Sequence, residues 1–105
     1  MADGAYTATA PSRTKGNLVT LRISPEYLTS DDRVLIVDDF LATGQTLIAL
    51  ADIITQSGAQ LVGIGTVVEK LFEDGRAHVA EQVDSAVPII SLAKIDLVDD
   101  ALVVS

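Results

Sequence analysis

The 105-residue chain contains no cysteine, so it has no disulfide framework and no thiolate chemistry. It has a single histidine, His78, which excludes a multi-histidine metal site within one chain. No apolar run is long enough to cross a bilayer, and the N-terminus lacks the basic-then-apolar pattern of a signal peptide. From these absences we predict a cytoplasmic protein.

Basic residues are also few: seven lysines and arginines stand against fifteen acidic residues, which gives a net charge of −8. A surface of that sign repels phosphodiester backbones and anionic lipids, so we expect neither nucleic acid nor a membrane as a partner. Apolar residues make up 49% of the chain and charged residues 21%, a balance typical of folded proteins. The length allows one domain with a modest core.

Residues 34–46 form the most informative segment of the sequence. Residues 34–37 are four consecutive apolar residues, which predicts a strand of a parallel sheet that is covered on both faces. Asp38 and Asp39 follow directly, at the strand end where open α/β sheets bind ligands. A loop of small and polar residues then leads into a helix, so backbone N–H groups and the positive end of the helix dipole would face one pocket. This segment, named the phosphate loop below, comprises Ala42, Thr43, Gly44, Gln45 and Thr46.

The apolar pattern predicts an α/β fold built on a parallel sheet. Strands are expected at residues 18–23 (antiparallel or at an edge), 33–38, 61–68, 88–92 and 101–104. Apolar residues at helical spacing predict a helix over residues 45–57, and Gly58 is placed to end it. A strand–helix–strand unit of this spacing is a right-handed crossover.

The other segments carry weaker patterns. Residues 1–17 are expected to be a flexible loop or tail, residues 28–32 a polar connection, and residues 95–100 a polar turn. Asp74 is a candidate N-cap for a second helix. Its inward residues are expected to be Val79, Ala80 and Val83.

Two adjacent carboxylates can bind a metal, accept hydrogen bonds from a sugar diol, or act as acid and base. Because neighbours on a strand point to opposite faces, we expect one of Asp38 and Asp39 to face the pocket. A purely structural alternative has Asp39 bonding the loop amides and Thr43 capping the helix. Diol-binding acids followed at once by a phosphate cradle describe a site for a ribose 5-phosphate.

With those residues in view, the segment 34–46 resembles the phosphoribosyl pyrophosphate (PRPP) motif of the type I phosphoribosyltransferases. Together with residues 63–76 it is most similar to the bacterial members of that family that act on xanthine. The resemblance implies the family's parallel-sheet α/β fold, but it covers only the C-terminal half of a typical family member. We therefore expect residues 1–105 to be one partial domain that is truncated at its N-terminus.

The resemblance implies transfer of a phosphoribosyl group from PRPP to xanthine, which gives XMP and pyrophosphate. Asp38 and Asp39 would contact the ribose hydroxyls and support the positive charge of the transition state. The phosphate loop would hold the 5-phosphate, Lys70 would meet the oxygen-rich edge of the purine, and Phe72 would pack on the base. Mg²⁺ would be bound with the pyrophosphate of PRPP.

The partial resemblance leaves the independent activity of this chain open. An absent half would leave sheet edges and apolar faces uncovered, which favours a homodimer or a complementing chain. Residues 6–15 resemble the mobile loop that closes over such sites. The polar residues of that loop would be Ser12, Thr14 and Lys15.

Several other interpretations remain. The same PRPP motif occurs in regulators of purine metabolism that only sense the ligand, so a non-catalytic PRPP-binding module is the main alternative. A signalling receiver domain also opens with an apolar strand ending in two acids, but the phosphate loop would then have no role. The base could be another purine. Taken structurally, Lys70 is a solvated charge, Phe72 a core residue and His78 a surface or interface residue.

Overall fold

The computed structural model describes residues 4–11 and 18–104 of the chain. Its elements, in order, are β1 (Tyr6–Pro11), β2 (Leu18–Ile23), β3 (Arg33–Leu41), α1 (Gln45–Ser57), β4 (Gln60–Lys70), the 3₁₀ turn η1 (Leu71–Glu73), α2 (Gly75–Gln82), β5 (Ile89–Val98) and β6 (Ala101–Val104). Within the part of the chain that the structure describes, no helix is long and apolar enough to cross a bilayer.

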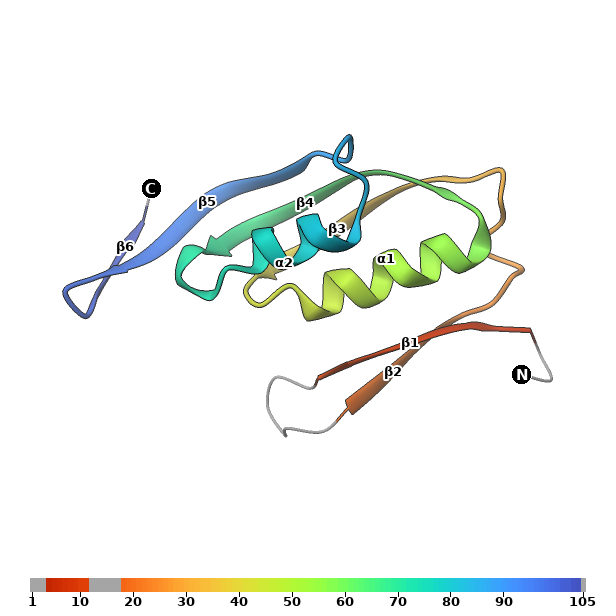
Figure 1. Ribbon diagram of the computed structural model, residues 1–105, viewed down its shortest axis with the longest axis horizontal. Helices are drawn as coiled ribbons and strands as arrows, with labels where there is room; N and C mark the ends of the chain where they lie inside the picture. Colours follow the sequence, from red (N-terminus) through yellow and green to blue (C-terminus); the bar gives the residue numbers. More distant parts are fainter. Residues whose placement is uncertain (1–3, 12–17, 105) are drawn as a thin grey trace.

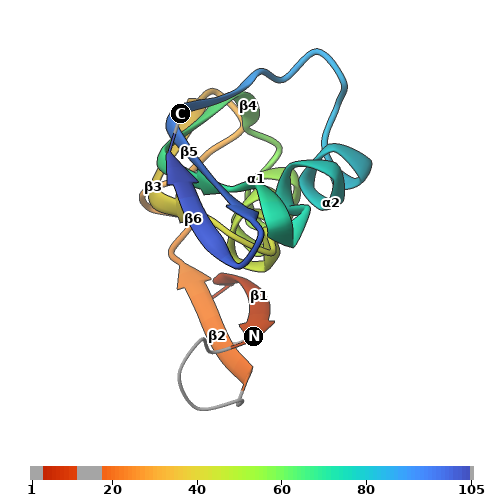
Figure 2. The same cartoon turned by 90° about the vertical axis from the view of Figure 1, so that its left-hand side faces the viewer.

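The main sheet has the strand order β3-β4-β5-β6 (Figure 1). β3, β4 and β5 run parallel, and β6 turns back antiparallel to β5 at the edge. Both helices lie on the same side of this sheet in the two views of the molecule (Figure 2). The expected α/β class is confirmed, with β3, α1 and β4 as the predicted strand–helix–strand unit.

The hydrophobic core lies between the sheet and the helices. One row across the sheet joins Ile36, Ile64 and Ile89 on neighbouring strands. This row packs against the inner faces of α1 and α2. The buried core cluster comprises Leu28, Ile36, Leu41, Leu47, Ile53, Ile54, Ile64 and Val79. Leu28 corrects the prediction of a polar connection at residues 28–32, because this one apolar side chain turns into the core.

The opposite face of the sheet is not covered by any described element, so the prediction that residues 34–37 are covered on both faces is wrong. Leu35 and Val37 are 61% and 70% exposed, and Ile90 and Leu92 on β5 are 61% and 80% exposed. Val37 and Ile90 lie on one register line, each paired with Gly65 of β4. The outer face of the sheet, defined by these four side chains, is therefore an apolar surface.

An antiparallel pair, β1 and β2, lies on the far side of α1 from the sheet (Figure 1). The structure corrects the expectation of a flexible segment at residues 6–11, which form β1, and confirms the antiparallel strand at residues 18–23. The Gln56 side chain fixes α1 to this pair: its Nε2 donates to Thr7 O at 2.7 Å, and its Oε1 accepts from Thr7 N at 3.3 Å. The predictions for residues 1–3 and 12–17 lie outside the described residues.

The structure contains the main helices and strands that the sequence predicts, but the first or last residues of several of them differ from the prediction. β3 continues past the acidic pair to Leu41, and β5 continues to Val98, so the polar turn predicted at residues 95–100 shrinks to the reversal at Asp99 and Asp100. Pairing with β6 overrides the local polar pattern there. Asp74 does precede α2, but with a φ of 56° and no capping bond from its side chain, and Ala80 is exposed rather than inward.

Candidate functional site

A cavity of about 360 Å³ opens at the carboxyl ends of β3 and β4, where α1 begins. This volume is within the range of small-molecule sites. Its position is the sheet edge that the sequence predicted for a ligand. It is lined by Pro11, Asp38, Phe40, Ala42, Thr43, Gly44, Gln45, Thr46, Leu47, Lys70 and Glu73. The structure therefore brings together the whole phosphate loop, one of the two predicted acids and the predicted base-binding lysine.

The two adjacent aspartates are separated by the strand geometry. Because β3 runs on to Leu41, neighbouring side chains still alternate. Asp38 and Phe40 line the cavity, whereas Asp39 is exposed and does not. Asp39 Oδ1 accepts a hydrogen bond from the Phe40 amide at 2.8 Å.

The phosphate loop delivers the N-terminus of α1 to the cavity. Gly44 is the N-cap residue, with a φ of 85° that favours glycine, and its carbonyl accepts the first helical bond from Ile48 N at 2.9 Å. Thr43 is therefore not the cap, and none of the described side chains caps this end. The first turn also carries no acidic residue. Its leading N–H groups and the positive end of the dipole thus remain available to an anion.

Lys70 reaches the cavity from the last residue of β4. Its Nζ lies 5.3 Å from the centroid of the Phe40 ring, a cation–π arrangement that holds the ammonium beside an aromatic face. Phe72 lies on η1, is 41% exposed and does not line the cavity. Phe40, rather than Phe72, is the aromatic ring that the structure places in the site.

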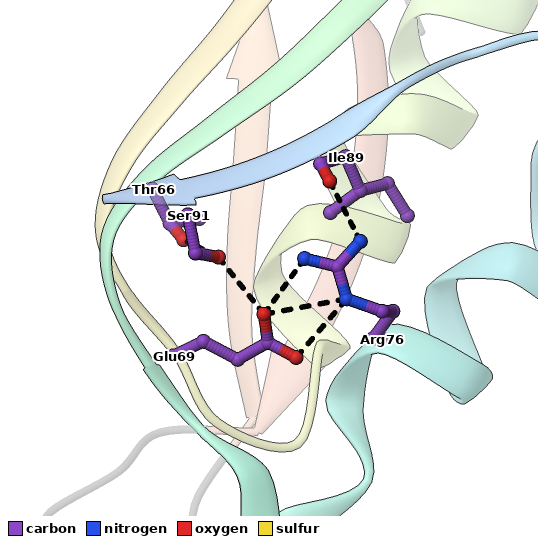
Figure 3. A network of polar contacts seen from close by, with 5 residues as sticks. All are labelled: Thr66, Glu69, Arg76, Ile89 and Ser91. Atoms are coloured by element: carbon purple, nitrogen blue, oxygen red, sulfur yellow. Dashed lines mark hydrogen bonds and ion pairs between the residues drawn. The ribbon is translucent and has the colours of Figure 1, made fainter. Parts of the chain in front are cut away.

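Glu69, the residue before Lys70, belongs to a partly buried polar network with Arg76 and Ser91 (Figure 3). The Glu69 carboxylate accepts from Arg76 Nη2 at 2.7 Å and from Nε at 3.1 Å, and Arg76 Nη1 donates to Ile89 O at 2.6 Å. Ser91 Oγ donates to Glu69 Oε1 at 3.0 Å, and it shares a 2.8 Å hydrogen bond with Thr66 Oγ1. The network ties α2, which carries Arg76, to the end of β4 and the beginning of β5.

The network also sets the charge state of Glu69. The hydrogen bond from Arg76 lowers the pKa of the Glu69 carboxyl below its ordinary value of 4.5, against the opposing effect of burial, and the Ser91 hydrogen bond acts in the same direction as Arg76. The Glu69 carboxylate likewise raises the pKa of Arg76. At neutral pH the pair is therefore fully ionised, although the Glu69 side chain is only 4% exposed.

Several residues of the site region were not assigned from the sequence. Phe40 would have been found had the strand been extended, because it lies two residues from Asp38 and so shares its face. Pro11 and Glu73 line the cavity from β1 and η1, and their placement depends on long-range packing. His78 is exposed, as predicted, but its Nδ1 also lies 3.0 Å from Thr43 O in the phosphate loop.

The sequence matches the model of the phosphoribosyl transferase domain over residues 3–92. It is 56% identical over 95 residues to a protein named xanthine phosphoribosyltransferase from Deinococcus deserti, and 45% identical to one of the same name from Streptococcus pyogenes serotype M5. Each match covers 90% of this chain and 48% of the relative. The chain thus spans about half the length of the curated relatives that it matches.

Solved structures of adenine phosphoribosyltransferases share the fold. The enzyme from Thermoanaerobacter pseudethanolicus superimposes with a TM-score of 0.70 at 30% identity, covering 86% of this chain and 48% of that one. The enzyme from Trypanosoma brucei, crystallised with AMP, pyrophosphate and ribose-5-phosphate, gives a TM-score of 0.73 at 21% identity, covering 91% and 42%. The fold is that of the type I phosphoribosyltransferases, and with the match over residues 3–92 the chain belongs to the phosphoribosyltransferase family.

Proposed function

We propose that this chain carries the ribose 5-phosphate and purine sites of a cytoplasmic xanthine phosphoribosyltransferase, which transfers the phosphoribosyl group of PRPP to xanthine and gives XMP and pyrophosphate. One observation carries the proposal: a single cavity joins Asp38, the uncapped N-terminus of α1 and Lys70. These groups match the diol, the 5-phosphate and the base of one nucleotide.

The N-terminus of α1 suits the 5-phosphate. Backbone N–H groups and the helix dipole bind a phosphate without basic side chains, which resolves the conflict with the net charge of −8. Thr43 and Thr46 add hydroxyls beside the amides. Asp38 approaches from β3, where its carboxylate can accept hydrogen bonds from both ribose hydroxyls.

Lys70 supports an oxidised purine as the base. An ammonium group donates hydrogen bonds and accepts none, so it favours the carbonyl-rich edge of xanthine over the amino group of adenine. The two relatives named above are xanthine phosphoribosyltransferases, whereas the two structural neighbours described are adenine enzymes. Because enzymes of both kinds are similar to this chain, we assign the discrimination to a side chain of the cavity and not to the fold.

Catalysis by such a site consists of positioning and electrostatic support. With phosphate, ribose and base held in one cavity, the purine nitrogen is presented to the anomeric carbon. In this proposal the Asp38 carboxylate supports the positive charge that develops on the ribose ring in the transition state. Mg²⁺ bound to pyrophosphate needs only one or two protein carboxylates. Asp38 and Glu73 line the cavity, so they would fit a metal that arrives with PRPP, and that metal would supply electrostatic support for the leaving group. No cluster of three or more potential metal ligands occurs among the described residues.

The test is calorimetric titration of the folded chain with PRPP and Mg²⁺. We expect saturable binding that Asp38→Asn weakens by roughly 10- to 100-fold, as for the loss of charge-assisted hydrogen bonds. Asp31→Asn, an exposed aspartate before β3, is the matched control and should bind like the wild type. Absence of binding by a folded chain would contradict a working site in these 105 residues.

Base preference needs a separate titration, because it can fail while the phosphate site works. We expect XMP to bind more tightly than AMP, and Lys70→Met to remove that preference while ribose 5-phosphate binding is kept. Equal affinities of the wild type for XMP and AMP would contradict the assignment to xanthine. If nucleotide binding is intact but no XMP forms when the half of a relative that this chain does not match is added, the non-catalytic PRPP-binding module becomes the better interpretation.

A further inference from the structure

Helix α2 contacts the phosphate loop, although none of its residues lines the cavity. His78 Nδ1 lies 3.0 Å from Thr43 O. A carbonyl oxygen can only accept, so Nδ1 must carry the hydrogen and donate it. The His78 side chain is exposed, which separates this bond from the packing of the core.

The backbone of α2 also meets the loop without a side chain between them. A Cβ on Gly75 would lie 2.0 Å from Ala42 O, closer than any real contact. A Cβ on Gly44 would lie 2.7 Å from Val79 Cγ2, and Val79 is fully buried. Glycine at both positions lets α2 approach the loop directly.

These contacts fix the orientation of two peptide groups. In a trans peptide the C=O and the following N–H point in opposite directions. Because the carbonyls of Ala42 and Thr43 face α2, the N–H groups of Thr43 and Gly44 are directed away from α2. The same loop residues line the cavity and α2 does not, so this orientation suits an anion in the cavity.

We propose that α2 is a buttress for the phosphate loop and that His78 is a positioning residue, which holds the Thr43 carbonyl so that the Gly44 N–H faces the 5-phosphate. The inference rests on the proposed function of the cavity and extends it to residues outside its lining. The buttress is itself fixed, because Arg76, two residues before His78, donates hydrogen bonds to Glu69 and to Ile89 O (Figure 3).

The first test is calorimetric titration with ribose 5-phosphate. His78→Ala should weaken binding by about 2- to 10-fold, as expected for one hydrogen bond. His78→Asn should restore most of the affinity, because its amide nitrogen can donate from nearly the same position as Nδ1. Gln82→Ala, an exposed change on the same helix, is the control. All three variants should keep the urea midpoint of the wild type, since His78 is exposed. Equal affinity of His78→Ala and the wild type would overturn the proposal.

A ligand-free measurement separates this inference from the proposed function. In alkaline buffer, where imidazoles are neutral, ¹⁵N spectra should show the His78 ring protonated at Nδ1, and the Gly44 amide signal should move in His78→Ala and return in His78→Asn. That result supports the buttress even if ribose 5-phosphate does not bind, in which case only the proposed function fails. A ring protonated at Nε2 instead would overturn the buttress whatever binds.

Discussion

Replacing Arg76 with methionine should destabilise the fold, because the Glu69 carboxylate then stays buried without its positively charged partner. Arg76 donates three hydrogen bonds to Glu69 and one to Ile89 O. Without them the Glu69 carboxylate, with a side chain only 4% exposed, keeps the hydrogen bond that Ser91 Oγ donates. Breaking a buried ion pair costs about 3–5 kcal/mol, but Arg76 is 40% exposed, so water can enter where it was. We expect a loss of about 2–3 kcal/mol.

That loss is a large part of the roughly 5–15 kcal/mol by which a domain is stable. The assay is urea unfolding followed by far-UV circular dichroism, and thermal melts should show a midpoint about 10–20 °C lower. The double variant Glu69→Leu with Arg76→Met should regain most of the stability, because no charge is then buried, while Ser91 keeps its bond to Thr66.

Lys94→Met is the matched control, because Lys94 is an exposed cation that acts on Glu69 only at a distance. It should change the unfolding free energy by less than about 0.5 kcal/mol. The reasoning is refuted if Arg76→Met is as stable as Lys94→Met, or if the double variant is no more stable than Arg76→Met alone.

Three further predictions concern Glu69, Gly75 and the outer face of the sheet. Because folding lowers the pKa of Glu69, the ionised carboxylate stabilises the folded chain above pH 4.5, and this stabilisation is lost as the pH falls through the folded-state pKa. The difference in unfolding free energy between the wild type and Glu69→Gln should therefore be largest near neutral pH and disappear on acidification. Gly75→Ala should lower the unfolding free energy by about 1–3 kcal/mol or more and weaken ribose 5-phosphate binding, because the added Cβ meets Ala42 O. Gly65→Ala, whose Cβ has no atom within 4 Å, should be nearly neutral, and equal urea midpoints for the two variants would contradict this. Leu92→Gln on the outer face should lower self-association in sedimentation velocity, while Tyr27→Ser, similarly exposed in the turn after β2, should not.

Local signals predicted the central unit of the fold well. The helix at residues 45–57 has the predicted bounds, and Gly58 ends it with a φ of 79°. Helical periodicity and a C-terminal glycine depend on neighbours in sequence, so they can be read directly. The phosphate loop was predictable for the same reason, because a helix N-terminus after a strand is defined within a few residues.

The ends of strands were less predictable, because pairing decides them. Two aspartates disfavour a strand locally, yet Asp38 pairs with Thr66 and Phe40 with Val68, so β3 continues to Leu41. The shorter prediction hid Phe40, whose place in the cavity depends on that continuation. Because the predicted strand was too short, Phe72 and not Phe40 was assigned to the base.

Contacts between segments that are distant in the chain could not be predicted from the sequence. Glu69 and Arg76 are separated by η1, and only the fold of that turn brings them together with Ser91 of β5. The bond from His78 to Thr43 spans 35 residues. An apolar run such as residues 34–37 indicates burial, but its exposure on one side depends on which elements cover the sheet.

The most direct test of the site is to map PRPP and Mg²⁺ onto the ¹⁵N-labelled chain by amide chemical shifts. The account predicts that the largest shifts occur at residues 43–47 and at Lys70, with little change at the other end of the sheet around Arg33 and Gln60. Shifts centred on Arg33 and Gln60, or none at residues 43–47 on saturation, would contradict the assignment of the cavity at the start of α1 as the ribose-phosphate site.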